Sequence, residues 1–138
     1  MPANKAPIFP ETPQVSFDSA VTAANTAKDA ASGTVYTVFT ADATDGSFLQ
    51  KLRVRPKGTN VVTVMRIFIN NGGATTTAAN NSLYDELPLP ATTNSEVAAL
   101  PGYEVPFNMM LPATYRILVT LGTSVAGGYA VTAVGGAY

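Results

Sequence analysis

The sequence predicts an all-β protein: an antiparallel β-sandwich of about eight strands, jelly-roll or immunoglobulin-like, with an extended N-terminal arm. Apolar and polar side chains alternate with a period of two along most of the chain. Turn-forming residues separate these runs at intervals of about 8 to 12 residues. The 138 residues suffice for one core and contain no second-domain boundary. We therefore expect an arm, residues 1–13, and a single sandwich domain, residues 14–138.

Prolines define the expected arm, at Pro2, Pro7, Pro10 and Pro13. Each proline fixes φ and removes a backbone donor, which favours an extended stretch outside the core. The apolar residues Ile8 and Phe9 leave two alternatives, a flexible terminus or an arm that docks on a neighbouring subunit. Docking would gain about 1.5 to 3 kcal/mol for each buried side chain.

The first strand is expected from Val15 to Val21, and its alternation places four residues on one side: Val15, Phe17, Ser19 and Val21. Residues 23–33 contain several alanines, but their turn formers favour a loop over a short helix. The β-branched and aromatic run Thr34–Thr40 is the second predicted strand.

A turn at Asp42–Ser47 leads into a predicted strand, Phe48–Arg55. Alternation separates its side chains into two sets, Phe48, Leu52 and Val54 against Lys51, Arg53 and Arg55. The following Arg55–Gly58 has the residue pattern of a type I turn, so we expect a hairpin with Val61–Ile69. This second arm is apolar on both faces, which predicts a central strand.

Residues 70–82 lack periodicity and indicate a long exposed loop. Further strands are expected at 83–89, 103–111, 115–121 and 129–133, with a less regular segment at 95–100 and a turn at 122–128. Pro106 lies inside one of these runs and favours an edge strand or a bulge there.

The composition excludes several kinds of catalysis. The chain has no His and no Cys, and only 12% of its residues are charged. Catalytic sites of the Ser-His-Asp, Cys-His and zinc-hydrolase types are therefore absent from this chain. We expect a protein that is not an enzyme and that has no cofactor.

Metal and phosphate sites are not expected either. Asp42 with Asp45, and Asp85 with Glu86, offer oxygen ligands for Ca²⁺, but neither pair matches an EF-hand loop and turn formation explains them better. Three glycine pairs lack the phosphate-binding pattern, so we interpret them as turns: Gly72-Gly73, Gly127-Gly128 and Gly135-Gly136.

Net charge and hydropathy limit the partners. The formal charge is −1, which gives no general attraction to nucleic acid or to anionic membranes. The N-terminus has no apolar signal region, and no apolar run approaches the about 18 residues of a membrane span. These features predict a soluble protein made in the cytoplasm, with neither nucleic acid nor membrane as a partner.

The densest basic group, Lys51, Arg53, Arg55 and Lys57, leaves three alternatives: a solvated strand face, a nucleic-acid surface, or salt bridges with an acidic partner. Arg53 and Arg55 suit bidentate pairing with carboxylates. Four tyrosines could stack on sugars, although the absence of Trp weakens this interpretation: Tyr84, Tyr103, Tyr129 and Tyr138.

Two stretches, Asn25–Asn71 (NTAKDAASGTVYTVFT onward) and Leu111–Tyr138 (LPATYRILVTLGTSVAGGYAVTAVGGAY), resemble small virion proteins of tailed bacteriophages. The resemblance is to auxiliary proteins of the capsid, also called decoration or cement proteins. It implies a β-rich protein, made in the host cytoplasm, that binds the major capsid protein on the outer capsid surface, commonly as a homotrimer, and stabilises the shell.

A second interpretation is a head-fibre or tail-associated module that contacts host surface glycans. The candidate partner-binding residues are Ile8, Phe9, Arg53 and Arg55.

Overall fold

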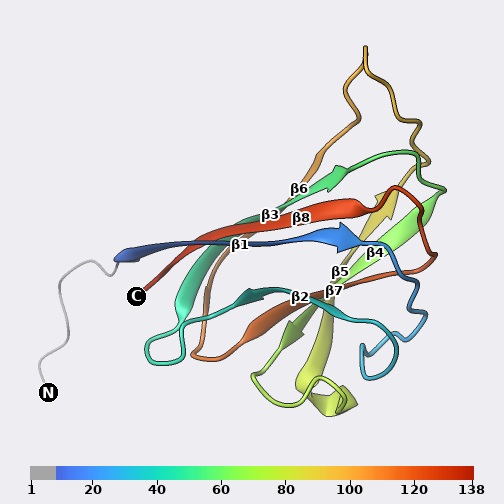
Figure 1. The fold of residues 1–138 in the computed structure, drawn as a ribbon. Helices are drawn as coiled ribbons and strands as arrows, with labels where there is room; N and C mark the ends of the chain where they lie inside the picture. The colour runs from blue at the N-terminus through green and yellow to red at the C-terminus, as the bar shows by residue number, and fades with distance from the viewer. Residues whose placement is uncertain (1–8) are drawn as a thin grey trace, which may run out of the picture.

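A computed structural model describes residues 9–138, which fold into eight β-strands and one short 3-10 helix (Figure 1). The helix, η1, spans Ala78–Asn80. The strands are β1 (Thr12–Val21), β2 (Tyr36–Thr40), β3 (Ser47–Pro56), β4 (Thr63–Asn70), β5 (Asn81–Leu89), β6 (Tyr103–Leu111), β7 (Arg116–Leu121) and β8 (Tyr129–Ala137). The all-β prediction is confirmed.

The strands form two antiparallel four-stranded sheets. Sheet A has the order β1-β8-β3-β6, and sheet B has the order β2-β7-β4-β5. The first strand therefore pairs with the last, the second with the seventh, the third with the sixth and the fourth with the fifth. This nested pairing of eight strands is that of a jelly roll, which decides between the two predicted kinds of β-sandwich.

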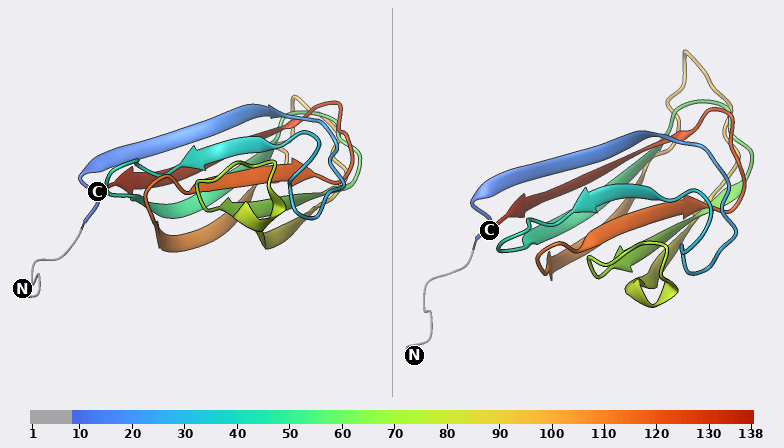
Figure 2. Two further views of the ribbon diagram at one scale, coloured as in Figure 1. Left: turned by 90° about the horizontal axis from the view of Figure 1, so that it is seen from below. Right: turned by 60° about the horizontal axis from the view of Figure 1, so that its bottom comes forward.

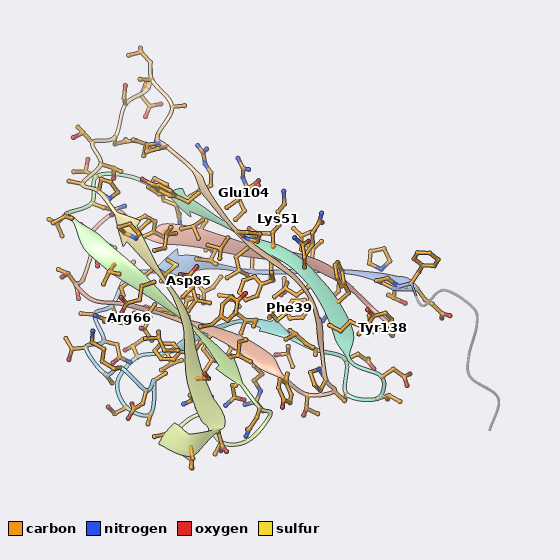
Figure 3. The ribbon with its side chains drawn as sticks, turned by 180° about the vertical axis from the view of Figure 1, so that it is seen from behind. Phe39, Lys51, Arg66, Asp85, Glu104 and Tyr138 are labelled. Carbon is orange, nitrogen blue, oxygen red and sulfur yellow. The ribbon has the colours of Figure 1, made fainter. Side chains whose placement is uncertain are left out.

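The core lies between the two sheets. Sheet A supplies Leu49, Leu52 and Val131, and sheet B supplies Met65, Ile67 and Val119, all with no exposed surface. Alternation places every second side chain of a strand on this inner side. Phe39 of β2 also lies between the layers (Figure 3).

Side chains close both long edges of the sandwich. At one edge β1 and β2 run beside each other (Figure 2), and two β1 side chains donate hydrogen bonds to β2 carbonyls. Gln14 Nε2 lies 2.7 Å from the Thr40 oxygen, and Ser16 Oγ lies 2.6 Å from the Val38 oxygen. At the other edge Tyr84 of β5 stacks on Phe107 of β6, with ring centroids 4.9 Å apart.

The predicted hairpin of residues 48–55 with 61–69 is wrong. β3 lies in sheet A and β4 in sheet B, so residues 57–62 cross between the layers. Asn60 holds this crossing: its Nδ2 donates to the Gly128 carbonyl at 3.1 Å, and its Oδ1 accepts from the Gly128 amide at 2.9 Å. Its backbone also forms a bridge to Thr92. These contacts lie far along the chain, so the local turn pattern did not reveal them.

The predicted central strand is confirmed in β4, which pairs with β5 on one side and β7 on the other. Val61 and Val62, expected within that run, precede the strand and are exposed. The prediction for Pro106 is also confirmed, because β6 is an edge strand and its pairing with β3 contains a register shift at this point.

That same irregularity changes the faces of β3. The register shifts between Leu49 and Lys51, so Leu49 points into the core and Phe48 points outward, contrary to the predicted grouping of Phe48 with Leu52. A second shift, between Asp18 and Val21, buries Val21 on the side opposite to its expected neighbours in β1. A bulge adds one residue and thereby reverses the alternation beyond it.

Gly135 and Gly136 lie inside β8, so their interpretation as a turn is wrong. A Cβ on Gly135 would collide with the Phe48 carbonyl at the β3 irregularity. A Cβ on Gly136 would meet the ring of Pro10, which lies over this position. Glycine is required at both positions because a neighbouring group lies too close for any side chain. By contrast, Gly72 and Gly128 do adopt the positive φ of turns, +90° and +78°.

Two connecting segments also differ from expectation. Residues 95–100 form no strand. Residues 70–82 contain η1 and the start of β5, and asparagine side chains bind their backbone: Asn70 accepts from the Gly72 amide, and Asn80 donates to the Ala74 carbonyl. The expected long loop is therefore an internally hydrogen-bonded connection.

The sandwich begins earlier than residue 14. β1 starts at Thr12, and the Glu11 amide donates to the Ala137 carbonyl at 2.8 Å. Ile8 lies outside the described residues.

Candidate partner-binding face

The outer face of sheet B is covered by the chain itself. Residues 22–35 pass over it, and Ala30 and Val35 pack on Phe68 and Leu118. The side chain of Asn25 holds this segment by donating to the carbonyls of Ser32 and Thr34, at 2.7 and 2.9 Å. Beside it Arg66 Nε donates to Glu86 Oε1 at 3.0 Å. The part of this face on β4 and β7 is therefore covered, whereas Leu83 of β5, in register with Phe68, is 41% exposed.

The outer face of sheet A carries exposed apolar side chains. Val15 and Phe17 of β1 are 62% and 69% exposed, and Met110 of β6 is 67% exposed. Between these two edge strands, Phe48 of β3 and Val134 of β8 are partly exposed. Large exposed apolar side chains grouped on one surface are typical of interaction sites.

The inner side of β1 explains why its apolar residues point outward. Gln14 and Ser16 point inward, where they bind the β2 carbonyls, and Gln14 also accepts a hydrogen bond from Ser47 at 2.7 Å. Because successive side chains of a strand point to opposite faces, Val15 and Phe17 must then face the exterior. The apolar strip is a consequence of closing the sandwich edge with polar groups.

A group of cations lies across the middle of this face. In register, Val15 is opposite Val134, which is opposite Lys51, and Phe17 is opposite Thr132, which is opposite Arg53. Arg55 follows on the same side of β3. The predicted basic strand face therefore exists, and it lies beside the apolar strip of β1.

Glu104 of β6 pairs with two of these cations. Its Oε1 lies 3.0 Å from Lys51 Nζ and 2.8 Å from an Arg53 guanidinium nitrogen. The hydrogen bond from Lys51, followed by the charge of Lys51 and the contacts of Arg53, lowers the pKa of the Glu104 carboxyl. Figure 3 shows Lys51 and Glu104 together on the outer side of the molecule.

Arg55 has no carboxylate within 4.0 Å among residues 9–138. Its guanidinium lies near Gly102, where an added Cβ would be 3.0 Å from one of its nitrogens. On this face Lys51 and Arg53 therefore share one carboxylate and Arg55 has none, although the whole chain has a charge of −1.

The N-terminal arm lies at the end of this face that is opposite to Arg55. Pro10 lies over Gly136, and together with Pro13 and Phe48 it lines a shallow depression there. Phe9 precedes Pro10 and is 71% exposed. Of the four predicted partner-binding residues, Phe9 thus adjoins the arm end of the face, while Arg53 and Arg55 lie on it toward the other end.

The remaining predicted groups have structural roles. The Asp42 carboxylate accepts the amides of Thr44 and Asp45, at 2.9 and 3.0 Å, and these bonds lower its pKa. Asp42 therefore forms the turn, as expected. Glu86 is engaged by Arg66. Within residues 9–138 no three acidic side chains gather where they could hold a metal ion. No helix in this part of the chain is long and apolar enough to cross a membrane.

The sequence patterns did not identify the segment between β5 and β6 as a surface feature. Val97 in this segment is 96% exposed, and Ser95 Oγ accepts hydrogen bonds from the amides of Val97 and Ala98, at 3.2 and 3.1 Å. The local signals for this turn are Ser95 and the turn-forming residues Asn94, Pro101 and Gly102 near it.

The fold and this face define the molecule as a jelly-roll β-sandwich with one face covered and one face open. No protein-family model and no curated protein matches the chain. Solved structures that resemble it include two of infectious bursal disease virus. For the Gt strain, identity is 18%, coverage is 89% of this chain and 32% of that chain, and the TM-score is 0.29.

For the Gx strain, identity is 17%, coverage is 98% of this chain and 35% of that chain, and the TM-score is again 0.29. The chain thus spans about a third of the length of these viral chains. At these values neither similarity assigns a function.

Proposed function

We propose that this chain is a non-enzymatic structural protein of a virion, a decoration protein that binds the outer surface of a phage capsid and stabilises the shell. The observation that carries the proposal is the open outer face of sheet A, with its exposed apolar strip and its cations. The sequence resemblance to phage decoration proteins supplies the partner, the major capsid protein. Jelly rolls build many viral capsid domains, which agrees with this role by analogy of fold.

The arm end of the face is the part that we assign to the capsid. Phe9, Val15 and Met110 are exposed there, and each would gain about 1.5 to 3 kcal/mol if a partner buried it fully. Residues 1–8 precede Phe9 in the sequence. A standard interface buries about 800 Å² on each partner, and repetition over the lattice multiplies a modest stabilisation per site.

The alternative, a glycan-binding module of a head fibre or tail, is also compatible with a jelly roll, because lectins share the fold. Sugar binding commonly uses exposed aromatic rings. Here the Tyr84 ring stacks on Phe107, and Tyr129 is buried in the core. The exposed rings of the open face belong to Phe17 and Phe48, which carry no polar group for a sugar hydroxyl, and its cations suit carboxylates, which favours a protein partner.

The test is cryo-electron microscopy of virions purified from the virus that encodes this chain. We expect many copies on the icosahedral lattice, with the arm end of the face against the capsid. A few copies at the tail would instead support the glycan-binding alternative, and absence from particles would refute the virion role.

A matched pair of variants tests the face. Val15→Ser and Val62→Ser remove similar side chains with similar exposure, 62% and 67%, but only Val15 lies on the outer face of sheet A. We expect Val15→Ser to lower the occupancy of particles about tenfold or more at limiting protein, and Val62→Ser to leave it unchanged.

Removing residues 1–9, which precede β1, should lower occupancy while the fold stays intact. Equal occupancy for all variants would show that this face does not bind the capsid.

A further inference from the structure

The segment between β5 and β6 forms a projecting tip. Figure 1 shows it extending beyond the ends of the strands at the top of the view. Its base is fixed, because Thr92 Oγ1 donates to the Gly58 carbonyl at 2.7 Å and the Asn94 amide donates to Thr59 Oγ1 at 3.0 Å. We call residues 95–98 the β5–β6 tip.

The tip presents one acidic and one apolar side chain. Glu96 is the only charged residue between β5 and β6, and it forms no ion pair within the described part of the chain. Val97 is 96% exposed, more than any other large apolar side chain of the described residues. The two hydrogen bonds to Ser95 Oγ fix the turn that displays them. An exposed, ordered acidic and apolar pair is suited to a basic and apolar site.

The outer face of sheet A contains a site of that chemistry. Phe17 is 69% exposed and lies in register with Thr132 and Arg53, and Arg55 is the next outward residue of β3. Glu104 already binds Lys51 and Arg53, whereas Arg55 has no carboxylate partner among residues 9–138. An incoming carboxylate can therefore pair with Arg55, since the next cation, Lys57, donates its Nζ to the Ser19 carbonyl at 2.6 Å.

We propose that the β5–β6 tip of one copy of this chain binds the Phe17–Arg55 end of the outer face of sheet A in a second copy. Glu96 of the first copy pairs with Arg55 of the second, and Val97 packs on Phe17. The tip of a given molecule projects away from its own strands (Figure 1), so the contact joins two molecules. A second copy is assigned as the partner because its tip is complementary to this site: an acidic side chain faces a basic one, and an apolar side chain faces an apolar one.

Donor and acceptor are different surfaces in this contact, so it is made either once, as a head-to-tail link that repeats until a ring closes, or twice, as a reciprocal exchange between two copies. A closed ring gives a physical basis for the homotrimer that the resemblance implies. The arm end of the face, around Pro10 and Met110, stays uncovered and remains available to a capsid. The inference concerns the isolated chain and does not depend on the virion role.

Charge reversal tests the ion pair. In sedimentation-velocity measurements of the purified chain, Glu96→Lys and Arg55→Glu should each weaken association about tenfold or more, and the double variant should restore it. Asp45→Lys and Lys28→Glu make the same charge changes away from the contact and should leave association unchanged. Circular dichroism of each variant checks that the fold is intact.

Cross-linking tests the geometry. The chain has no Cys, so single cysteines introduced at chosen positions are the only thiols. An oxidised mixture of the Val97→Cys and Phe17→Cys variants should yield a disulfide-linked dimer, whereas Val97→Cys mixed with Val62→Cys should not. Val62 serves as the control because it is 67% exposed and lies outside the face.

Three results would overturn the inference. The first is a strictly monomeric chain, and the second is equal cross-linking in both mixtures. The third is a Phe17→Cys variant that, on its own, cross-links to the same extent as the mixture, which indicates a symmetric face-to-face dimer. Because no capsid is present in these experiments, their failure leaves the virion role untouched. Conversely, a chain missing from particles would leave the contact between copies intact.

Discussion

At the scale of single residues, the charge that the open face offers to a partner depends on which of its cations are already paired. Glu104 accepts hydrogen bonds from Lys51 and Arg53 through one oxygen, so two cations are bound within sheet A while Arg55 is left available. The sequence predicted the cations by their spacing in β3. It did not predict the carboxylate, because Glu104 lies 53 residues beyond Lys51 and meets it only through the β3–β6 pairing.

The Glu104 contacts predict a pH dependence of stability. The pKa of Glu104 is lowered in the folded protein, so its contribution is fully present above the ordinary pKa of the unfolded chain and is lost as pH falls through the lowered folded value. Urea unfolding of the native chain and of Glu104→Gln should differ at neutral pH and converge in acid. A difference that stays constant across this range would mean that the ion pairs do not stabilise the fold.

At the scale of elements, β1 shows how an edge strand can serve two purposes. Its inward residues Gln14 and Ser16 bind the carbonyls of Thr40 and Val38, which would otherwise be open to pairing with another chain. Its outward residues Val15 and Phe17 form the apolar strip. Periodicity alone predicted the two sides of the strand, but the core face could not be assigned without the position of β2.

Removing both edge contacts should promote aggregation. In Gln14→Ala with Ser16→Ala, two β2 carbonyls lose their side-chain donors, each worth about 1 kcal/mol. We expect a lower midpoint in urea unfolding and a faster rise in light scattering on heating than for the native chain. Ser19→Ala, an exposed position of the same strand, is the control and should have neither effect.

At the scale of the whole molecule, the nested pairing makes distant segments depend on each other. β8 lies between β1 and β3, so the two ends of the described chain share one sheet. The crossing from β3 to β4 is fixed by Asn60, whose side chain binds both backbone groups of Gly128, 68 residues away. We call these two hydrogen bonds the Asn60 clasp. The clasp, rather than the turn at Pro56, directs the chain from sheet A into sheet B.

Substituting Asn60 should therefore destabilise the entire fold. Asn60→Ala leaves the buried amide of Gly128 without a partner, at a cost of about 1 to 3 kcal/mol, whereas the Gly128 carbonyl still accepts from the Lys57 amide at 3.0 Å. We expect a single cooperative unfolding transition at a lower urea concentration. Loss of less than about 0.5 kcal/mol, measured with the same urea dependence, would show that water replaces the side chain at the clasp.

The sequence by itself determined the strand content and the local chemistry of this protein. Period-two alternation located the strands because side-chain direction in a strand depends only on neighbouring residues. The absence of His and Cys excluded whole classes of catalysis without any structure. The spacing of Lys51, Arg53 and Arg55 placed three cations on one side of a strand.

The tertiary structure alone decided which strands pair, which face is open and which cation is left for a partner. Pairing joins residues up to 125 positions apart, such as Thr12 and Ala137, and bulges in β1 and β3 reverse the faces that simple alternation assigns. Such contacts depend on the simultaneous packing of all eight strands. A sequence pattern reflects only contacts between residues that are close in the chain. The open face of sheet A and the β5–β6 tip depend on contacts between distant strands, so they form only when the two sheets pack together.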